Sequence, residues 1–161
     1  MNYRTLQLMV RVELSKERKY VDLGLPSGTL WADRNVGADS PEKFGDCFTW
    51  DDAIEEIDGI PSIEQFQELM TCAHVWATVR NVEGLLFTGP NGNTLFVPAS
   101  YCHGIDVGSG YWSSSLNDRC SDYAQQFSIY SPDYSGCMCC WSSHPCDERK
   151  AVRTVKTGGV R

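Results

Sequence analysis

Side chains that could bind a metal ion or act as nucleophiles gather towards the C-terminal end of the chain. Five of its eight cysteines lie between residues 120 and 146. Cys137, Cys139, Cys140, His144 and Cys146 could supply soft zinc ligands, but their spacing matches no paired C-x₂-C pattern. Disulfide pairing is an alternative, although the adjacent Cys139 and Cys140 have an awkward geometry for pairing with each other. The spacing favours free thiols, without a metal site or a cofactor.

Catalytic arrangements of other kinds do not stand out. The three histidines, at positions 74, 103 and 144, lie in unrelated sequence contexts. No Ser/His/Asp or Cys/His set therefore suggests an activated nucleophile. We predict no catalytic residues, and we expect the protein to be a binding module rather than an enzyme.

One long stretch of the chain lacks the usual charged surface residues. Residues 84–147 contain neither Lys nor Glu, and the flanks carry every Lys and Glu of the chain. Long charged side chains are the ordinary filler of protein surfaces. Residues 100–153 are instead rich in Tyr, Ser, Asp, Asn, Cys, His and Gly. Tyr, Ser, Gly and Asn are also the residues that antibody-like paratopes use. We therefore interpret residues 1–99 mainly as scaffold and residues 100–153 as a recognition surface.

Hydrophobic periodicity predicts the elements of the first half. Residues 5–14 alternate apolar and polar side chains, which predicts a strand with one buried face. Residues 20–31 predict two short strands around the turn Pro26-Ser-Gly28, and residues 32–45 are irregular. The acidic residues 51–58 could suggest calcium, but they lack the spacing of an EF-hand and favour a solvated helix face.

The clearest helix begins at Ser62. Ser62 can cap it, and Gln65 can complete a capping box. Ile63, Phe66, Leu69 and Met70 form the buried stripe expected of that helix.

The rest of the chain reads as strands and loops. Residues 73–80 and 84–88 predict strands, and the turn at residues 89–92 leads into a hairpin partner at residues 93–98. Weaker signals predict strands at residues 111–112, at residues 123–130, around Met138 and Trp141, and at residues 151–155. Tyr111 and Trp112 fit a core role better than a contact role. Trp31, Trp50 and Trp76 are expected to be packing residues.

Length and charge limit the classes of protein. A chain of 161 residues is most consistent with a single domain, residues 1–161. A net charge of −7 and a pI near 4.9 argue against nucleic acid and against anionic membrane surfaces. No apolar run is long enough for a membrane span, so we expect no membrane insertion. Residues 1–11 lack the apolar block of a signal peptide.

A series of separate motifs resembles one known family. In chain order they are residues 20–32, residues 35–38, Gly45-Asp46 with Trp50, Pro61 leading the helix around Phe66, residues 88–93, residues 95–99, residues 110–114, and Val152-Arg153-x-Val155. Together they resemble the Fibrobacter succinogenes major paralogous domain, which is abundant in gut Bacteroidetes and their phages. The resemblance covers residues 20–156.

The resemblance implies both a fold and a function. The implied fold class is α+β, a C-type-lectin-like fold of the formylglycine-generating-enzyme type with short helices, small antiparallel sheets and much irregular loop. Some members of the family are variable proteins of diversity-generating retroelements, whose adenine-directed mutagenesis rewrites codons near the C-terminus. This implies a ligand-binding protein with a hypervariable surface, and a cell surface or phage particle as its location.

The codon chemistry of that process agrees with the composition of residues 84–147. Randomising the first two bases of an Asn codon yields Tyr, Ser, Asp, Asn, Cys, His, Gly and Arg, among others. It cannot yield Lys, Glu, Gln, Met or Trp. Gln125, Gln126, Met138, Trp112 and Trp141 are therefore expected to be fixed positions. The number of cysteines exceeds what this scheme predicts.

The residues expected to contact a protein or glycan ligand are polar or aromatic residues of the variable region. Tyr and Arg would be energetic anchors, and Asp, Asn and Ser would give directional hydrogen bonds. The candidates are Tyr101, His103, Asp106, Asn117, Asp118, Arg119, Asp122, Tyr123, Tyr130, Asp133, Tyr134, Ser142, Ser143, His144 and Asp147.

Three alternatives stay open. One is a non-variable surface or adhesin-like domain of the same fold. Another is a formylglycine-generating-type oxidase, in which Cys137, Cys139 and Cys140 could bind copper(I), although the Arg-Gly-Gly-Ser-type motifs of those enzymes are missing. The third is a calcium-dependent lectin, suggested by Asn117-Asp118, but the Trp of the lectin Trp-Asn-Asp motif is missing.

Overall fold

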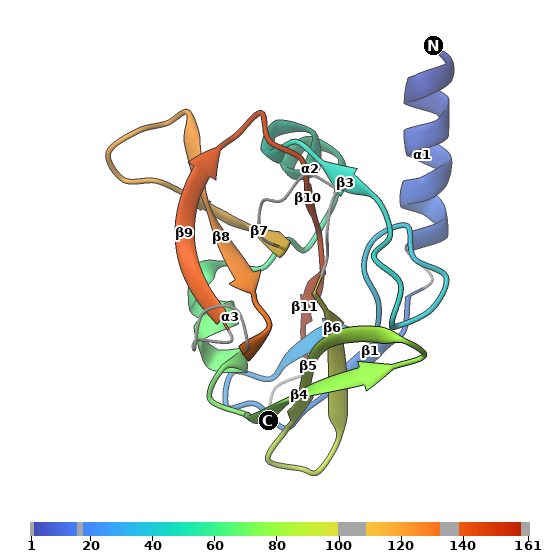
Figure 1. Ribbon diagram of the computed structural model, residues 1–161. Coiled ribbons are helices and arrows are strands. Elements are labelled where there is room, and N and C mark those ends of the chain that lie inside the picture. Colours follow the sequence, from blue (N-terminus) through green and yellow to red (C-terminus); the bar gives the residue numbers. More distant parts are fainter. Residues whose placement is uncertain (1, 16–17, 100–108, 133–138, 159–161) are drawn as a thin grey trace.

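The computed structural model describes residues 2–15, 18–99, 109–132 and 139–158. In these residues the chain is α+β, with short helices and small sheets (Figure 1). The sheet orders are β1-β2-β11, β3-β10-β7-β8-β9 and β4-β5-β6. None of the described helices is long and apolar enough to cross a membrane.

The first sheet joins the two ends of the chain. Strand β1 (Tyr20–Asp22) pairs antiparallel with β2 (Thr29–Ala32), and β2 pairs with β11 (Val155–Thr157). The prediction of two short strands around Pro26-Ser-Gly28 is confirmed. Gly28 has a φ of +77° and its N–H bonds the carbonyl of Leu25 (2.9 Å), so glycine suits this turn.

The five-stranded sheet contains the described strands of the predicted variable region. Its strands are β3 (Cys47–Phe48), β10 (Lys150–Ala151), β7 (Ser109–Leu116), β8 (Tyr123–Ile129) and β9 (Cys139–Pro145). Strand β10 runs parallel to β7, and the other neighbours are antiparallel. The expected strands around residues 111–112, 123–130 and Trp141 are confirmed, whereas Met138 lies outside the described residues.

The third sheet is a pair of hairpins. Strands β4 (Ala73–Val79), β5 (Val82–Thr88) and β6 (Thr94–Pro98) are consecutive and antiparallel. Arg80 and Asn81, with φ values of 47° and 67°, make the first turn. Both strands predicted around residues 73–88 and the hairpin that follows them are confirmed.

The two short internal helices form where the capping residues indicate. Helix α2 (Trp50–Glu56) starts at the N-cap Thr49, and Asp51 and Asp52 in its first turn suit the positive end of the helix dipole. Helix α3 (Ile63–Leu69) has the complete capping box between Ser62 and Gln65. As predicted, Ile63, Phe66 and Leu69 are buried, whereas Met70 is half-buried.

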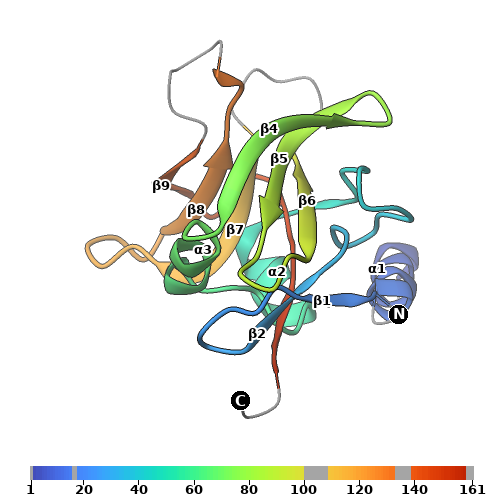
Figure 2. The ribbon, with the colours of Figure 1, turned by 90° about the horizontal axis from the view of Figure 1, so that it is seen from below.

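The strand predicted at residues 5–14 is wrong. This segment is helix α1 (Tyr3–Ser15), which stands at the opposite side of the molecule from β9 (Figures 1 and 2). Its Leu, Gln, Met, Arg and Glu residues favour helix, and Asn2 accepts a hydrogen bond from the N–H of Thr5 (2.8 Å). Leu8 packs against the protein body, but Leu6 and Met9 are exposed, so no buried sheet face explains the alternation.

The strand expected at residues 151–155 is also wrong in its extent. Lys150–Ala151 belongs to the five-stranded sheet, and Val155–Thr157 belongs to the first sheet. Between them, Val152 accepts a hydrogen bond from the N–H of Val36 and Thr154 from the N–H of Ala32 (2.9 Å each). The chain therefore changes partners at Arg153.

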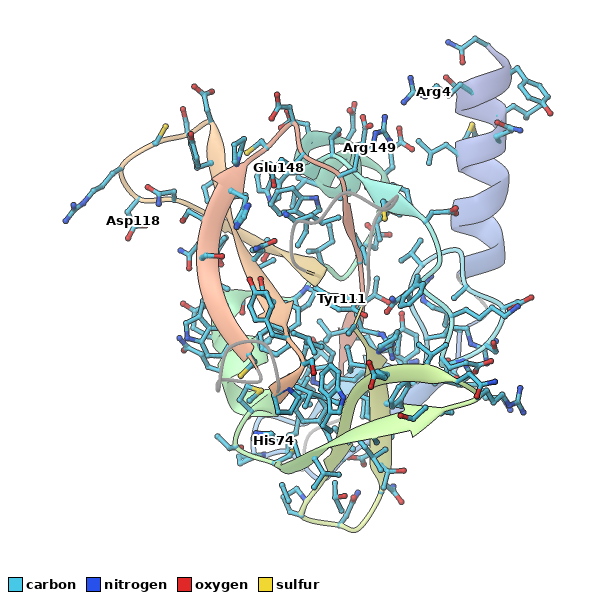
Figure 3. The ribbon with its side chains drawn as sticks, viewed as in Figure 1. Arg4, His74, Tyr111, Asp118, Glu148 and Arg149 are labelled. Atoms are coloured by element: carbon cyan, nitrogen blue, oxygen red, sulfur yellow. The ribbon has the colours of Figure 1, made fainter. Side chains whose placement is uncertain are left out.

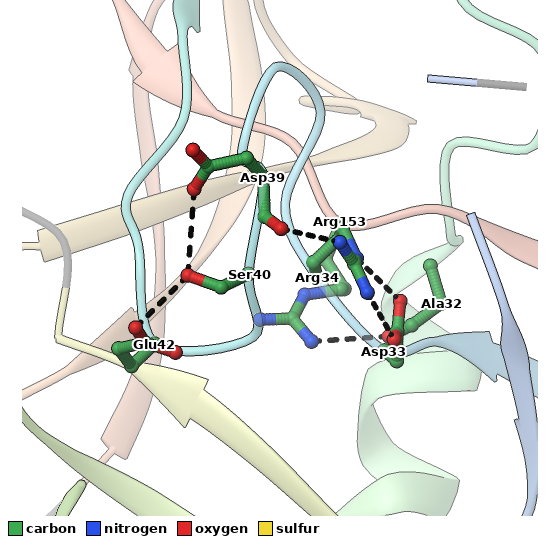
Figure 4. A network of polar contacts seen from close by, with 7 residues as sticks. All are labelled: Ala32, Asp33, Arg34, Asp39, Ser40, Glu42 and Arg153. Atoms are coloured by element: carbon green, nitrogen blue, oxygen red, sulfur yellow. Dashed lines mark hydrogen bonds and ion pairs between the residues drawn. The ribbon is translucent and has the colours of Figure 1, made fainter. Parts of the chain in front are cut away.

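Arg153 lies at this change of sheet and makes buried contacts there. Its buried guanidinium donates to Asn35 Oδ1 (2.7 Å) and to the carbonyl of Ala32 (3.0 Å). Burial lowers the pKa of Arg153 to about 10, so the side chain remains a cation at neutral pH. Figure 4 shows it beside the Asp33–Arg34 ion pair (2.8 Å). A buried cation needs these fixed acceptors, which tie the loop after β2 to the C-terminal segment.

Two hydrophobic clusters support the sheets. The larger one contains Trp31 and Phe66, whose ring centroids are 5.2 Å apart, together with Phe127 and Tyr111. The smaller one contains Trp112 and residues of α2. The expected packing roles are confirmed: Trp31, Tyr111 and Trp112 are buried, and Trp50 and Trp76 pack half-buried against the clusters.

Candidate functional site

The loop between β7 and β8 is built around Asn117. Asn117 Nδ2 donates to Ser143 Oγ on β9 (2.8 Å), and its Oδ1 accepts from the N–H groups of Arg119 (2.8 Å) and Cys120 (3.1 Å). The N–H of Asn117 also donates to the carbonyl of Tyr123 (2.9 Å), which closes the loop. The loop projects away from the sheets, with Asp118 near its outer end (Figure 3). Asn117 therefore holds the loop, while its neighbours face solvent.

The base of the loop is braced by a bulge in β7. The pairing of β7 with β8 shifts register between Trp112 and Leu116. Within the bulge, the backbone carbonyl of Ser113 accepts a hydrogen bond from Trp50 Nε1 (2.8 Å). The N–H of Ser114 donates to the carbonyl of Pro61 (2.8 Å). Bulges often redirect a strand beside a functional site. Here the bulge anchors the loop to the segments that carry α2 and α3.

A continuous set of polar side chains connects β8, β9, the turn after β9 and β10. We call it the polar row, and its members are Ser128, Gln126, Ser142, His144, Glu148 and Lys150. Gln126 Nε2 donates to Ser128 Oγ (2.8 Å) and Ser142 Oγ (3.1 Å). His144 Nε2 lies 3.1 Å from Ser142 Oγ, and its Nδ1 lies 2.9 Å from Glu148 Oε2. The row links buried and exposed parts of the predicted surface.

The charged end of the polar row is formed by Glu148 and Lys150. Lys150 Nζ lies 2.9 Å from Glu148 Oε2 and 5.4 Å from the centre of the Trp112 ring. Lys150 is only 4% exposed, so its ammonium depends on these partners. Burial raises the pKa of Glu148, but the hydrogen bonds and charges of Lys150 and His144 outweigh burial and hold the pKa below its usual value.

The side-chain oxygen of Gln126 is a hydrogen-bond acceptor that no described donor uses. The side chain of this residue is buried, and its Oε1 accepts no hydrogen bond from any described residue. A Cβ at Gly110 would stand 2.0 Å from this oxygen, so the glycine makes room for the amide. An unpaired buried oxygen costs free energy. The hydrogen bonds of the polar row therefore leave Oε1 of Gln126 without a donor among the described residues.

The structure brings nine of the predicted contact residues to one end of the five-stranded sheet. They lie on the β7–β8 loop, at the start of β8, on β9 and in the turn after it: Asn117, Asp118, Arg119, Asp122, Tyr123, Ser142, Ser143, His144 and Asp147. The N–H of Cys146 donates to the carbonyl of Asp122 (2.8 Å), which joins the turn to the loop. Tyr123 is 40% exposed. Tyr130 follows the other end of β8 and stands apart from this group.

The remaining predicted contact residues cannot be assigned to this group. Tyr101, His103, Asp106, Asp133 and Tyr134 lie outside the described residues.

Five residues of this region were missed as members of a site. Ser128, Gln126, Glu148 and Lys150 belong to the polar row, and Trp141 is 39% exposed on β9. Glu148 and Lys150 lie just after the Lys/Glu-free stretch. This position in the sequence is the signal that could have identified them. Gln126 and Trp141 gave no signal of a contact role, because burial and exposure are decided by the neighbouring strands.

The cysteines do not form one group. Cys47 is disulfide-bonded, so the interpretation of the cysteines as free thiols is wrong for this residue. Cys72, Cys120 and Cys146 are free thiols. Burial, with nearby carboxylates, raises the pKa of Cys72 and Cys146, which lowers their thiolate fraction at neutral pH. Within the described parts of the chain, no three His, Cys, Asp or Glu side chains are grouped to hold a metal ion.

A separate groove of about 420 Å³ lies away from the predicted contact residues. Tyr20, Gly59, Gln65 and Lys156 are among the residues that line it, and Lys156 Nζ sits 4.5 Å from the centre of the Tyr20 ring. The groove mixes a few polar groups with backbone and shows no nucleophile–base pair. We therefore regard the end of the five-stranded sheet as the candidate site.

Comparison with known proteins gives no relative. No protein-family model, no curated protein and no solved structure matches this chain.

Proposed function

We propose that the protein is a ligand-binding module of C-type-lectin-like fold, and the variable protein of a diversity-generating retroelement. Its ligand is a protein or glycan, bound by the β7–β8 loop, β9 and the turn after β9. The observation that carries the proposal is the convergence at one end of a braced sheet of nine polar or aromatic residues drawn from the Lys/Glu-free stretch. Loops held on a rigid scaffold are common carriers of binding residues.

The distribution of residue types supports the retroelement part of the proposal. Exposed positions of the loop carry Asp118, Arg119 and Asp122, which are types that randomised Asn codons encode. Trp112 and Gln126, which such codons cannot encode, are buried beneath. A scaffold that keeps its buried residues fixed can tolerate changes on the surface.

Gene context tests the proposal. The DNA around the gene would be sequenced to find a near-copy of the segment that encodes residues 100–155, next to a reverse transcriptase gene. We expect the copy to differ mainly at adenines, in the codons of Asp118, Arg119 and Asp122. The codon of Trp112, which contains no adenine, should be identical in both copies and serve as the internal control. Without a near-copy, the retroelement function is refuted and an ordinary surface domain remains.

A further inference from the structure

Strand β9 forms one outer edge of the five-stranded sheet. The order β3-β10-β7-β8-β9 leaves it with β8 on one side only. The N–H of Cys146 donates to the carbonyl of Asp122, and these residues flank the pair Tyr123–Pro145. In an antiparallel ladder this bond marks Tyr123–Pro145 as a non-hydrogen-bonded pair, and the two kinds of pair then alternate along the strands.

This alternation fixes the direction of every backbone group of β9. Ser142 and His144 pair with Gln126 and Ala124, and they direct their N–H and C=O groups towards β8. Trp141 and Ser143 fall in the intervening pairs, so their N–H and C=O groups point away from the sheet. None of the described residues outside β9 forms a backbone hydrogen bond with these outward groups.

The open part of the edge is short and well defined. Beyond Ser143, Pro145 has no N–H, and its carbonyl already accepts from the N–H of Glu148 (3.1 Å). Two N–H donors and two C=O acceptors, at Trp141 and Ser143, therefore remain for a partner. These N–H and C=O groups repeat every two residues along the strand. The backbone of another extended polypeptide has the same repeat and can pair with them.

The edge also lacks the features that normally prevent strand addition. Strand β9, Cys-Cys-Trp-Ser-Ser-His-Pro, carries no Lys, Arg, Asp or Glu, and its only proline is its last residue. The irregularity of the sheet lies between β7 and β8, whereas β8 and β9 pair without a shift. The opposite edge, β3, is only two residues long. An uncharged edge without an internal proline or a bulge lacks the usual protection against pairing with another strand.

Side chains beside the open edge would favour an apolar residue in the partner. The Trp141 ring lies 5.4 Å from the Phe127 ring, which stacks at 4.8 Å on Phe66 of α3, yet 39% of Trp141 is exposed. A side chain opposite Trp141 could cover this ring, because directly paired residues of adjacent strands are in contact. Ser142 and His144 face the other side of the sheet and offer polar contacts there.

Charge decides between a second copy and a different partner. Near the end of β9, the loop and turn carry the exposed Asp118, Asp122 and Asp147 against the exposed Arg119 and Arg149, and the chain carries a net charge of −7. Two copies joined through β9 would bring two chains of the same net charge together, whereas an uncharged or basic segment would not add to that charge. The partner is therefore a different polypeptide.

We propose that β9 binds an extended, uncharged or basic segment of a partner protein as an additional strand, through the N–H and C=O groups of Trp141 and Ser143. The proposal rests on the proposed function in taking this end of the sheet as the ligand-binding surface. It names the ligand as a polypeptide in extended conformation, recognised through its main chain.

The test begins with selection of random linear peptides on the immobilised protein. The best peptide is then measured against Ser143→Pro and Ser143→Ala by titration calorimetry. Proline removes the outward N–H and places its ring on the edge without breaking the ladder to β8. Alanine removes only the hydroxyl group that accepts from Asn117. We expect Ser143→Pro to weaken binding at least about tenfold more than Ser143→Ala, which reports the loss of the hydroxyl group alone.

A second measurement does not depend on any variant of the protein. The peptide is N-methylated at one position at a time, which removes one donor and adds bulk. Binding should be lost at alternate positions only, because alternate N–H groups of a strand face its neighbour. Amide hydrogen exchange should show new protection at Trp141 and Ser143 on binding, while Ser142 and His144 are already protected in the free protein.

Four outcomes overturn the proposal. These are the absence of any selected peptide, equal binding by Ser143→Pro, insensitivity to N-methylation, or protection of Trp141 and Ser143 in a dimer of the free protein. Parallel screens with a glycan array and with folded proteins separate this failure from failure of the proposed function. Binding there, without peptide binding, refutes the strand-addition proposal and leaves the ligand-binding function standing.

Discussion

Single residues of this protein have two different roles. Arg153 and Asn35 are buried, and they hold together segments that are far apart in the sequence. Glu148 instead joins the buried Lys150 to His144, beside the candidate binding surface. A buried ammonium group without an anion is costly, so Glu148 should matter for stability as well as for the order of the surface.

The low pKa of Glu148 predicts how stability depends on pH. A carboxylate whose pKa is lower in the folded state stabilises the protein above its ordinary value of 4.5 and loses that contribution as the pH falls through the folded-state value. We expect Glu148→Gln to lower the free energy of unfolding at pH 7 by about 1 kcal/mol or less, because water screens this partly exposed group. The difference from wild type should shrink as the pH falls below 4.5.

Urea unfolding of both proteins across this pH range measures the effect. Asp118→Asn is the matched control, because Asp118 is exposed and forms no ion pair with another described residue. It should follow wild type at every pH. A constant difference between Glu148→Gln and wild type down to acidic pH would contradict the assigned role.

Among the elements, α3 links the N-terminal half of the chain to the five-stranded sheet. Phe66 of this helix stacks on Phe127 of β8, and the N–H of Ile63 donates to Ser115 Oγ on β7 (3.3 Å). Because α3 has only seven residues, the stability of this helix depends strongly on its capping residues. The capping box at Ser62 thereby helps to position β7 and β8.

Removal of that cap tests the role of α3. Ser62→Ala should lower the free energy of unfolding by about 1 kcal/mol, since the N–H of Gln65 loses its acceptor. Thermal and urea unfolding measure this loss. Ser114→Ala, at an exposed serine of β7, is the control and should change stability by less than about 0.5 kcal/mol. Equal effects of the two substitutions would mean that the cap does not stabilise α3.

At the scale of the whole molecule, the proposed binding surface and the packed core are separate. The loop residues Asp118, Arg119 and Asp122 are exposed, whereas Gln126 and Ser128 on the neighbouring strand are buried. A protein selected for diversity at its surface needs this separation, because most stability is held by buried contacts.

Substitutions in the two places should therefore differ sharply. The triple variant Asp118→Tyr, Arg119→Tyr, Asp122→Tyr should change the free energy of unfolding by less than about 0.5 kcal/mol per substitution. Ser128→Tyr places the same side chain in a fully buried site and should destabilise the protein by about 2 kcal/mol or more. Urea unfolding compares the two. If the triple variant loses as much stability as Ser128→Tyr, the loop is structural and cannot be a site of diversification.

The sequence by itself determined those elements whose signals are local. The capping box at Ser62, the turn at Gly28 and the two hairpins of residues 73–98 follow from residues that are neighbours in the chain. The composition of residues 84–147 also located the candidate surface, and nine of its predicted contact residues lie at one end of the five-stranded sheet.

Only the tertiary structure decided the rest. A period of two over residues 5–14 does not make a strand where no neighbour pairs with it, and the same residues form a helix. Residues 150–157 are split between two sheets, and Arg153 at the split has buried partners that come from distant segments. Likewise, the burial of Gln126, the exposure of Trp141 and the open edge of β9 arise from strand order, because side chains and backbone groups acquire their surroundings only when separate segments pack together.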